Sequence, residues 1–149
     1  TSWFDWTLLD KHSDLFRFVK GLIHFRLGLS IYRQARGLSL VQLLRQSGLR
    51  WHGVKLNWPV WSHHSHSLAF SVQGQRGSFH LILNAYWEPL EFQLPPPPPG
   101  SLDGWRRVID TALESPEDFC PWNEAPVVEG STYPAQPRSV VLLLAAVTR

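Results

Sequence analysis

Residues Asn84-Ala85-Tyr86-Trp87-Glu88-Pro89 separate two segments whose side chains alternate like those of β-strands. The alternating apolar positions are Phe79, Leu81, Leu83 and Ala85 before this corner, and Leu90, Phe92 and Leu94 after it. Period-two alternation on both sides of a proline-containing corner predicts two antiparallel strands that form a hairpin with one buried face. We expect Tyr86 and Trp87 to close the core at the corner, because aromatic rings bury large areas.

A long helix is predicted ahead of the strands, from about Asp10 or Ser13 to Leu27. At about 3.6 residues per turn, its apolar side chains cover half of the circumference or more, a wider band than a surface helix usually carries. The band comprises Leu15, Phe16, Val19, Leu22, Ile23 and Leu27, widened by Phe18 and Phe25. Such a helix needs cover on two sides, so we expect a homodimer through Phe16–Leu27. The alternative is that the aromatic cluster at 3–6 covers the outer face within one chain.

Other strands are predicted at short, regular intervals, with turn residues between them. They are Trp51–Val54 as an edge strand, Leu68–Val72, Trp105–Asp110, and Ser139–Val147 as a central strand apolar on both faces. A tight connection at Gly74–Gly77, a short helix at Ser39–Arg45 and a solvated polyproline segment at Pro95–Pro99 complete the prediction. This spacing favours a mainly β fold, an antiparallel β-sandwich preceded by the helix.

Composition narrows the function classes. The net charge is +2 with scattered arginines, so no basic stripe indicates nucleic-acid binding. The single Cys120 excludes an internal disulfide framework and fits a reducing compartment. The sequence contains no apolar run long enough to span a bilayer and no signal segment, so we expect a cytoplasmic protein without a membrane partner.

Several residues could carry chemistry, and each also has a plainer interpretation. His63, His64 and His66 suggest a metal site, but neighbouring histidines on one loop rarely converge on one ion, so no metal is predicted. Cys120 beside Phe119 is expected to be an inert apolar residue. Trp58 and Trp61 could stack on sugars, although tryptophans near strands are more often core residues. The acidic side chains of 114–129 have no partner fixed by spacing, so neither a catalytic residue nor a cofactor is predicted.

Five segments, taken in order, resemble the C-terminal part of isoamylase-type glycogen debranching enzymes, glycoside hydrolases of the α-amylase superfamily. They are Trp51–Lys55, Ser67–Phe70, Asn84–Pro89, Trp105–Thr111 and Gln136–Val140. Residues Ser2–Trp6 also resemble the loop after the last barrel strand of those enzymes, and the predicted helix resembles the last helix of their (β/α)₈ barrel. The segments at Leu38–Gly48 and Pro95–Pro99 depart from that pattern.

The resemblance implies two parts, residues 1–36 as a remnant of the catalytic barrel and residues 37–149 as the C-terminal β-sandwich. Trp3, Phe4, Asp5 and Trp6 would then line the rim of the substrate cleft. The family's three catalytic acids lie on earlier barrel strands and match no position here, so the chain is expected to be an inactive fragment, proteolytic product or truncated gene product.

The resemblance further implies that the chain supports the barrel of an α-1,6-glucan debranching enzyme and meets α-glucan only within that enzyme. The alternatives are a free-standing glucan-binding module and an interaction domain without sugar affinity. Exposure of Trp58, Trp61 or Trp87 on a flat or concave face would favour the binding module, and burial of these rings would favour the structural role.

Overall fold

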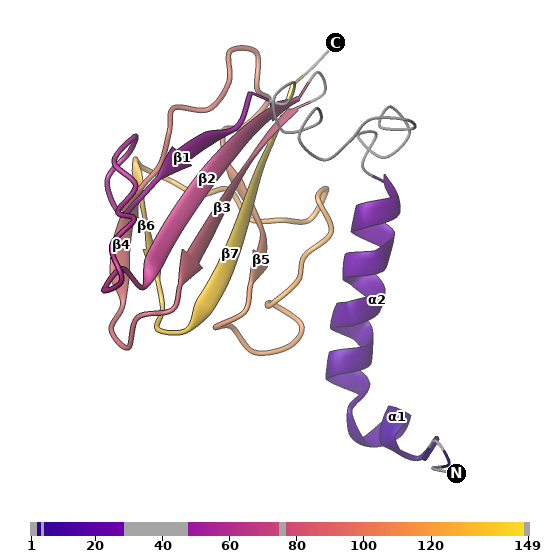
Figure 1. Cartoon of the computed structure of the whole chain (residues 1–149). Coiled ribbons are helices and arrows are strands. Elements are labelled where there is room, and N and C mark those ends of the chain that lie inside the picture. The colour runs from indigo at the N-terminus through magenta and orange to yellow at the C-terminus, as the bar shows by residue number, and fades with distance from the viewer. Residues whose placement is uncertain (1–2, 4, 29–47, 75–76, 148–149) are drawn as a thin grey trace, which may run out of the picture. The chain divides into compact units, whose positions relative to one another are not determined.

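The computed structural model describes residues 3, 5–28, 48–74 and 77–147, and Figure 1 shows the elements that they form. The chain divides into two compact units, Thr1–Gly37 and Leu38–Arg149, and each is described by itself. Within the described ranges, no helix is both long and apolar enough to cross a membrane.

The first unit contains a short helix α1, Leu8–Lys11, and a longer helix α2, Ser13–Gly28. Helix α2 confirms the predicted helix to within a residue or two at each end. None of its residues is buried, and the exposed apolar side chains are Leu15, Phe16, Val19, Ile23 and Leu27. The helix predicted at Ser39–Arg45 lies outside the described residues.

The second unit is built from seven described strands arranged in two antiparallel sheets. Their bounds are β1 Arg50–His52, β2 Ser67–Gly74, β3 Gly77–Asn84, β4 Leu90–Gln93, β5 Arg106–Asp110, β6 Thr132–Ala135 and β7 Ser139–Ala146. The larger sheet has the order β1-β2-β3-β7-β5, and β4 pairs with β6 in the smaller one (Figure 1). The mainly β fold with an N-terminal helix is therefore confirmed, as are β1 at an edge and β7 inside the sheet.

The hairpin predicted around the Asn84–Pro89 corner is wrong. Strand β3 pairs with β2 and β7, whereas β4 pairs with β6 in the smaller sheet. The corner therefore carries the chain from one sheet to the other. Strand β6 was not predicted, because it lies within a proline-rich segment and contains Pro134. A proline is tolerated there because β6 has a described partner on one side alone, as an edge strand does.

Asn84 holds this corner to the rest of the sandwich. Its side chain is 1% exposed, and its Nδ2 lies 3.1 Å from the carbonyl oxygens of Glu88 and Ala135 and 3.0 Å from that of Gln136. Its Oδ1 accepts the backbone N–H of Tyr86 at 3.1 Å. One amide side chain thus joins the end of β3 to the corner and to the segment between β6 and β7.

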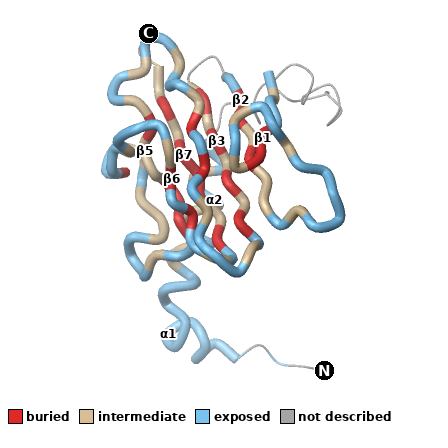
Figure 2. Tube along the Cα trace, turned by 90° about the vertical axis from the view of Figure 1, so that its left-hand side faces the viewer, coloured by how far each residue is buried: buried red, intermediate tan, exposed pale blue. Residues whose placement is uncertain are grey.

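The core lies between the sheets, and it uses the face of β3 opposite to the one that the large apolar side chains suggest. Cross-strand register places Ile82 of β3 beside Ala69 of β2 and Val141 of β7, and all three are fully buried. Phe92 of β4 and Tyr133 of β6 belong to the same core cluster. Figure 2 shows the buried residues concentrated along the strands of the sandwich.

The outer face of the larger sheet is also apolar. Register aligns the side chains of its three long strands in the rows Phe70-Leu81-Leu142, Leu68-Leu83-Val140 and Val72-Phe79-Leu144. An antiparallel sheet in a sandwich more often presents a polar outer face to water. The inner face combines the apolar Ile82, Val141 and Leu143 with small or polar residues such as Ala69, Ser71 and His80, and the rings of Phe92 and Tyr133 belong to the same core.

Trp87 also differs from its prediction. Tyr86 is half-buried, but Trp87 is 61% exposed and therefore does not close the core. The Tyr86 and Trp87 rings contact each other with centroids 4.0 Å apart, and His66 stacks beside Tyr86 at 6.2 Å.

Candidate functional site

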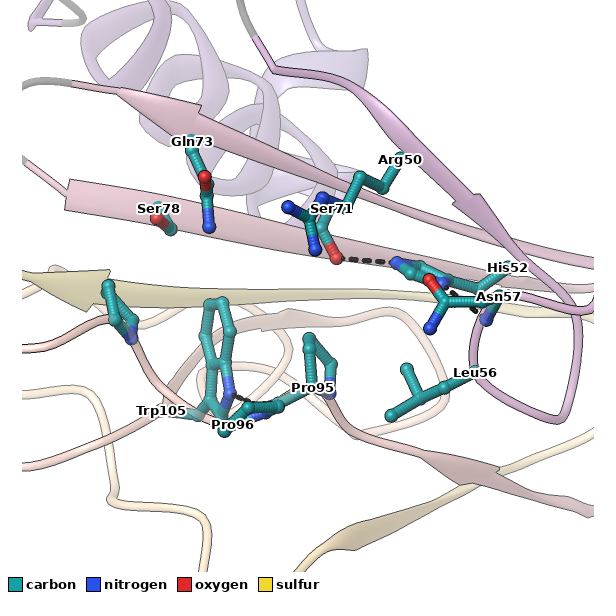
Figure 3. A pocket seen from close by; sticks show the side chains of 11 residues that line it. Arg50, His52, Leu56, Asn57, Ser71, Gln73, Ser78, Pro95, Pro96 and Trp105 are labelled. Atoms are coloured by element: carbon teal, nitrogen blue, oxygen red, sulfur yellow. Dashed lines mark hydrogen bonds between the residues drawn. The ribbon is translucent and has the colours of Figure 1, made fainter.

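A polar pocket lies where β1 and β2 meet the polyproline segment that follows β4. Its volume is about 130 Å³, and Figure 3 shows side chains from these segments around it. The polar lining residues are Arg50, His52, Asn57, Ser71, Gln73 and Ser78, and the apolar ones are Leu56, Pro95, Pro96, Pro98 and Trp105.

The polyproline segment contributes a wall of this pocket, so it is only partly the solvated segment that was predicted. Pro95 and Pro98 are half-buried, and the others in the run are exposed. The Trp105 indole N–H donates to the Pro95 carbonyl at 2.7 Å, which joins the segment to the residue before β5 (Figure 3). Trp105 is 4% exposed and belongs to the core, so the rigid ring and the stiff prolines hold one side of the pocket in place.

His52 and Ser71 line the pocket, and the fully buried His80 is hydrogen-bonded to Ser71. The backbone N–H of Asn57 donates to His52 Nδ1 at 2.9 Å, so the His52 proton is carried by Nε2. That N–H donates to Ser71 Oγ at 2.9 Å, and Ser71 Oγ also lies 2.9 Å from His80 Nδ1, within hydrogen-bond distance. The other ring nitrogen of His80, Nε2, is buried without a described partner.

Burial keeps this group of side chains neutral. Burial, with a smaller contribution from the nearby His52, lowers the pKa of His80 to about 4. The pKa of His52 is lowered by its own burial and by the positive charge of Arg50. The two imidazoles, bridged by the Ser71 hydroxyl, are therefore uncharged at neutral pH and offer no charged nucleophile or base.

The residues predicted to rim a substrate cleft precede α1. Trp3 is 92% and Trp6 72% exposed, and Phe4 lies outside the described residues. Asp5 accepts the Thr7 hydroxyl at 2.6 Å and its backbone N–H at 3.0 Å, and these hydrogen bonds lower the pKa of Asp5. The observed contacts of Asp5 are thus those of a turn before a helix, and the rim role stays a prediction.

The predicted sugar-stacking residues lie in the loop between β1 and β2. Trp58 is 71% and Trp61 66% exposed. The ring of Trp61 meets Trp51 edge to face at 5.5 Å, and Trp51 lies 5.4 Å from Phe70 on the outer face. The loop is tightly folded, because a Cβ on Gly53 would lie 2.4 Å from the Trp58 carbonyl oxygen. The two rings are exposed, which is one part of the condition stated above for a binding module, and the stacking role itself stays a prediction.

The candidate metal ligands and the candidate nucleophile lie outside the lining of the pocket. His63, His64 and His66 are exposed in the same loop, and the described part of the chain contains no group of three metal-ligating side chains. Cys120 is half-buried, with its sulfur 3.8 Å from the Glu117 carbonyl oxygen. The absence of a metal, a cofactor and a catalytic residue therefore stays a prediction.

Sequence reasoning missed the pocket, because its residues come from five separate segments. Its one local signal is the alternation of Ser78 and His80 with apolar residues, which is equally typical of a solvated face. Only the facing layer shows that these polar side chains point inward.

The comparisons with known proteins agree on one family. Residues 50–142 match the family described as "Isoamylase 1-3, C-terminal". The chain is 34% identical over 146 residues to "Isoamylase 3, chloroplastic" of Oryza sativa subsp. japonica, a match that covers 95% of the chain and 17% of that protein. It is 30% identical over 111 residues to "Isoamylase SU1, chloroplastic" of Zea mays, which covers 74% of the chain and 13% of that protein.

These matches extend over most of the chain but over less than a fifth of each relative. The segments quoted from 51 to 140 lie within the matched family region, so the resemblance inferred from sequence is confirmed. The names of these relatives describe them as chloroplastic, so they offer no support for the cytoplasmic expectation, which stays a prediction.

Proposed function

Since this chain belongs to the family of isoamylase 1–3 C-terminal domains, we propose that it is the non-catalytic support of a debranching enzyme's barrel. In the intact enzyme the barrel hydrolyses α-1,6-glucosidic bonds of glycogen or starch, and this domain covers one flank of it. α-Glucan is then a ligand of the whole enzyme, and the contribution of this chain is mechanical.

The observation that carries the proposal is the apolar outer face of the larger sheet. Rows such as Phe70-Leu81-Leu142 place large apolar side chains on three neighbouring strands, on the face opposite Ile82, where Phe70 and Leu81 are half-buried and Leu142 is 7% exposed. At about 25 cal/mol per Å², covering a few hundred Å² of such a surface stabilises an assembly by several kcal/mol before association costs. A barrel in the same polypeptide avoids most of those costs, because the two parts are already joined.

The test compares two matched leucine variants in the intact enzyme. Leu81→Gln changes the outer face, and Leu102→Gln changes a leucine that is 60% exposed in a loop. We expect Leu81→Gln to lower by several degrees the temperature at which debranching activity is lost, with little change in the initial rate. Burial of a leucine side chain stabilises the folded protein by about 1.5–3 kcal/mol, whereas an exposed leucine contributes little to stability. Equal inactivation temperatures for the two variants would contradict the supporting role.

The isolated chain supplies the complementary measurement. It is expected to release no reducing ends from glycogen, amylopectin or pullulan. Release above a buffer blank, from material free of contaminating amylase, would show that the chain carries catalytic groups of its own. The coding region upstream of Thr1, read for a barrel with three catalytic acids, bears on the same question.

A second candidate, a glucan-binding module, is favoured by the exposure of Trp58 and Trp61. Titration of the chain with maltoheptaose separates the two candidates, and weak or absent affinity is expected for a purely supporting domain. Micromolar binding that is lost in Trp58→Ala or Trp61→Ala would establish the module instead.

A further inference from the structure

We propose that the pocket beside the polyproline segment binds a small tetrahedral oxyanion, of the phosphate or sulfate class. The proposal is independent of the supporting role, since the pocket opens between the two layers of the sandwich and uses none of the outer-face residues. Its volume of about 130 Å³ is ample for a group of this size. It is too small to enclose a glucan chain.

The charge of the lining points to an anion. Among the described residues that line the pocket, Arg50 is the one that carries a charge at neutral pH, and none is a carboxylate. Figure 3 shows the Arg50 side chain turned from β1 toward Ser71 and Gln73. A guanidinium offers a planar fork of N–H donors that matches an oxyanion, and such charge-assisted bonds are about twice as strong as neutral ones. A cation, by contrast, would meet a positive charge and no carboxylate ligand.

Further donors line the same pocket on the side of Arg50. Cross-strand register pairs Arg50 with Ser71, and Gln73 lies two residues further along β2, opposite Ser78. Asn57 lines the other end, beside His52. Among the described residues, no hydrogen bond of the Asn57, Gln73 or Ser78 side chains is observed. Gln73 and Ser78 can therefore donate an N–H and an O–H to an oxyanion that the Arg50 fork holds.

The walls hold the lining in place. His52 hydrogen-bonds to Ser71, and Ser71 hydrogen-bonds to His80, so these side chains stay ordered without a ligand. Trp105 directs its N–H to the Pro95 carbonyl, which leaves an apolar ring and prolines facing the pocket on the other side. Arg50 itself is exposed, so the attraction rests on the charge-assisted hydrogen bonds of its fork and not on exclusion of water.

Sodium phosphate is the probe, titrated at constant ionic strength with sodium chloride as the balancing salt. We expect a saturable rise in the melting temperature of the whole chain, because a ligand that binds the native state stabilises it. Arg50→Gln should weaken the apparent affinity about ten-fold or more, since it removes a hydrogen bond to a charged group. Lys55→Gln is the matched control, because Lys55 is an exposed cation outside the lining, and it should leave the affinity unchanged.

A second variant and a second measurement distinguish a loss of phosphate binding from a loss of folding. Gln73→Glu preserves the shape of the side chain but places a carboxylate in the lining, and it should abolish the phosphate response. In ¹H–¹⁵N spectra, phosphate should shift the side-chain signals of Asn57, Gln73 and Trp105 in the unaltered chain. Equal stabilisation of the unaltered chain and Arg50→Gln would reveal a general salt effect and overturn the proposal. Stabilisation by maltose without any response to phosphate would overturn it as well.

Discussion

Replacing Asn84 with alanine tests the view that one amide group joins the two sheets. The side chain makes four contacts of 3.0–3.1 Å with backbone groups and is 1% exposed. A net hydrogen bond contributes about 1 kcal/mol, and a buried carbonyl left without a donor costs about 1–3 kcal/mol. We therefore expect Asn84→Ala to lower the free energy of unfolding by about 3–4 kcal/mol. For a domain of about 150 residues this corresponds to about 8–12 °C in melting temperature.

Urea unfolding, followed by circular dichroism and by tryptophan fluorescence, measures this change. Asn123→Ala is the matched control, because Asn123 is exposed in a loop and should change stability by less than about 0.5 kcal/mol. Asn84→Asp sharpens the test, since it keeps the shape but turns an oxygen toward three carbonyl oxygens. It should be more destabilising at pH 7 than at pH 4, where the carboxyl group can carry a proton. A loss below about 1 kcal/mol for Asn84→Ala, with an unchanged m-value, would refute the assigned role.

Three further outcomes are expected. Tyr133→Phe should lower the free energy of unfolding by about 1.5–3 kcal/mol, because it removes a buried 2.6 Å hydrogen bond to the Asp110 carboxylate. Tyr86→Phe, the control, should lower it little. Equal losses of stability in urea unfolding would contradict this. The pKa of His80 in the folded protein is about 4, against 6.5 ordinarily, so the unfolded chain binds more protons and stability falls as pH drops from 6.5 to 4. The fall should reach about 3 kcal/mol and be much smaller in His80→Gln, and equal pH profiles would disprove it. We also propose self-association through α2, which light scattering should detect as a concentration-dependent mass abolished by Ile23→Glu; a constant 17.1 kDa would exclude it.

The local sequence determines several secondary-structure elements and the family of this protein. Helix α2 follows from the periodicity of its apolar residues, and β2, β3 and β7 follow from β-rich runs bounded by turn residues. The family also follows from short segments in fixed order, because such a series is specific even where each member is not. These signals depend on residues that are close in the sequence, so they can be interpreted without knowing which helices and strands pack against each other.

The tertiary structure decided which face of β3 became the core. Phe79, Leu81 and Leu83 form the more apolar face in sequence, yet Ile82 and His80 on the other face are fully buried. Alternation specifies that two faces exist but not which of them meets the second sheet. That choice depends on the corner at Asn84, which sends the chain into the other sheet instead of back along β3.

The pocket also depends on the tertiary structure. Arg50, Ser71, Ser78 and Trp105 are separated along the chain, and pairing of β1 with β2, of β2 with β3 and the path of the polyproline segment bring them together. Hydrogen bonds among buried polar groups depend on the low-dielectric layer that surrounds them, and that layer exists only once the two sheets have packed. The sequence by itself therefore determined the helix, the long strands and the family, whereas packing of the sheets decided the buried face and the pocket.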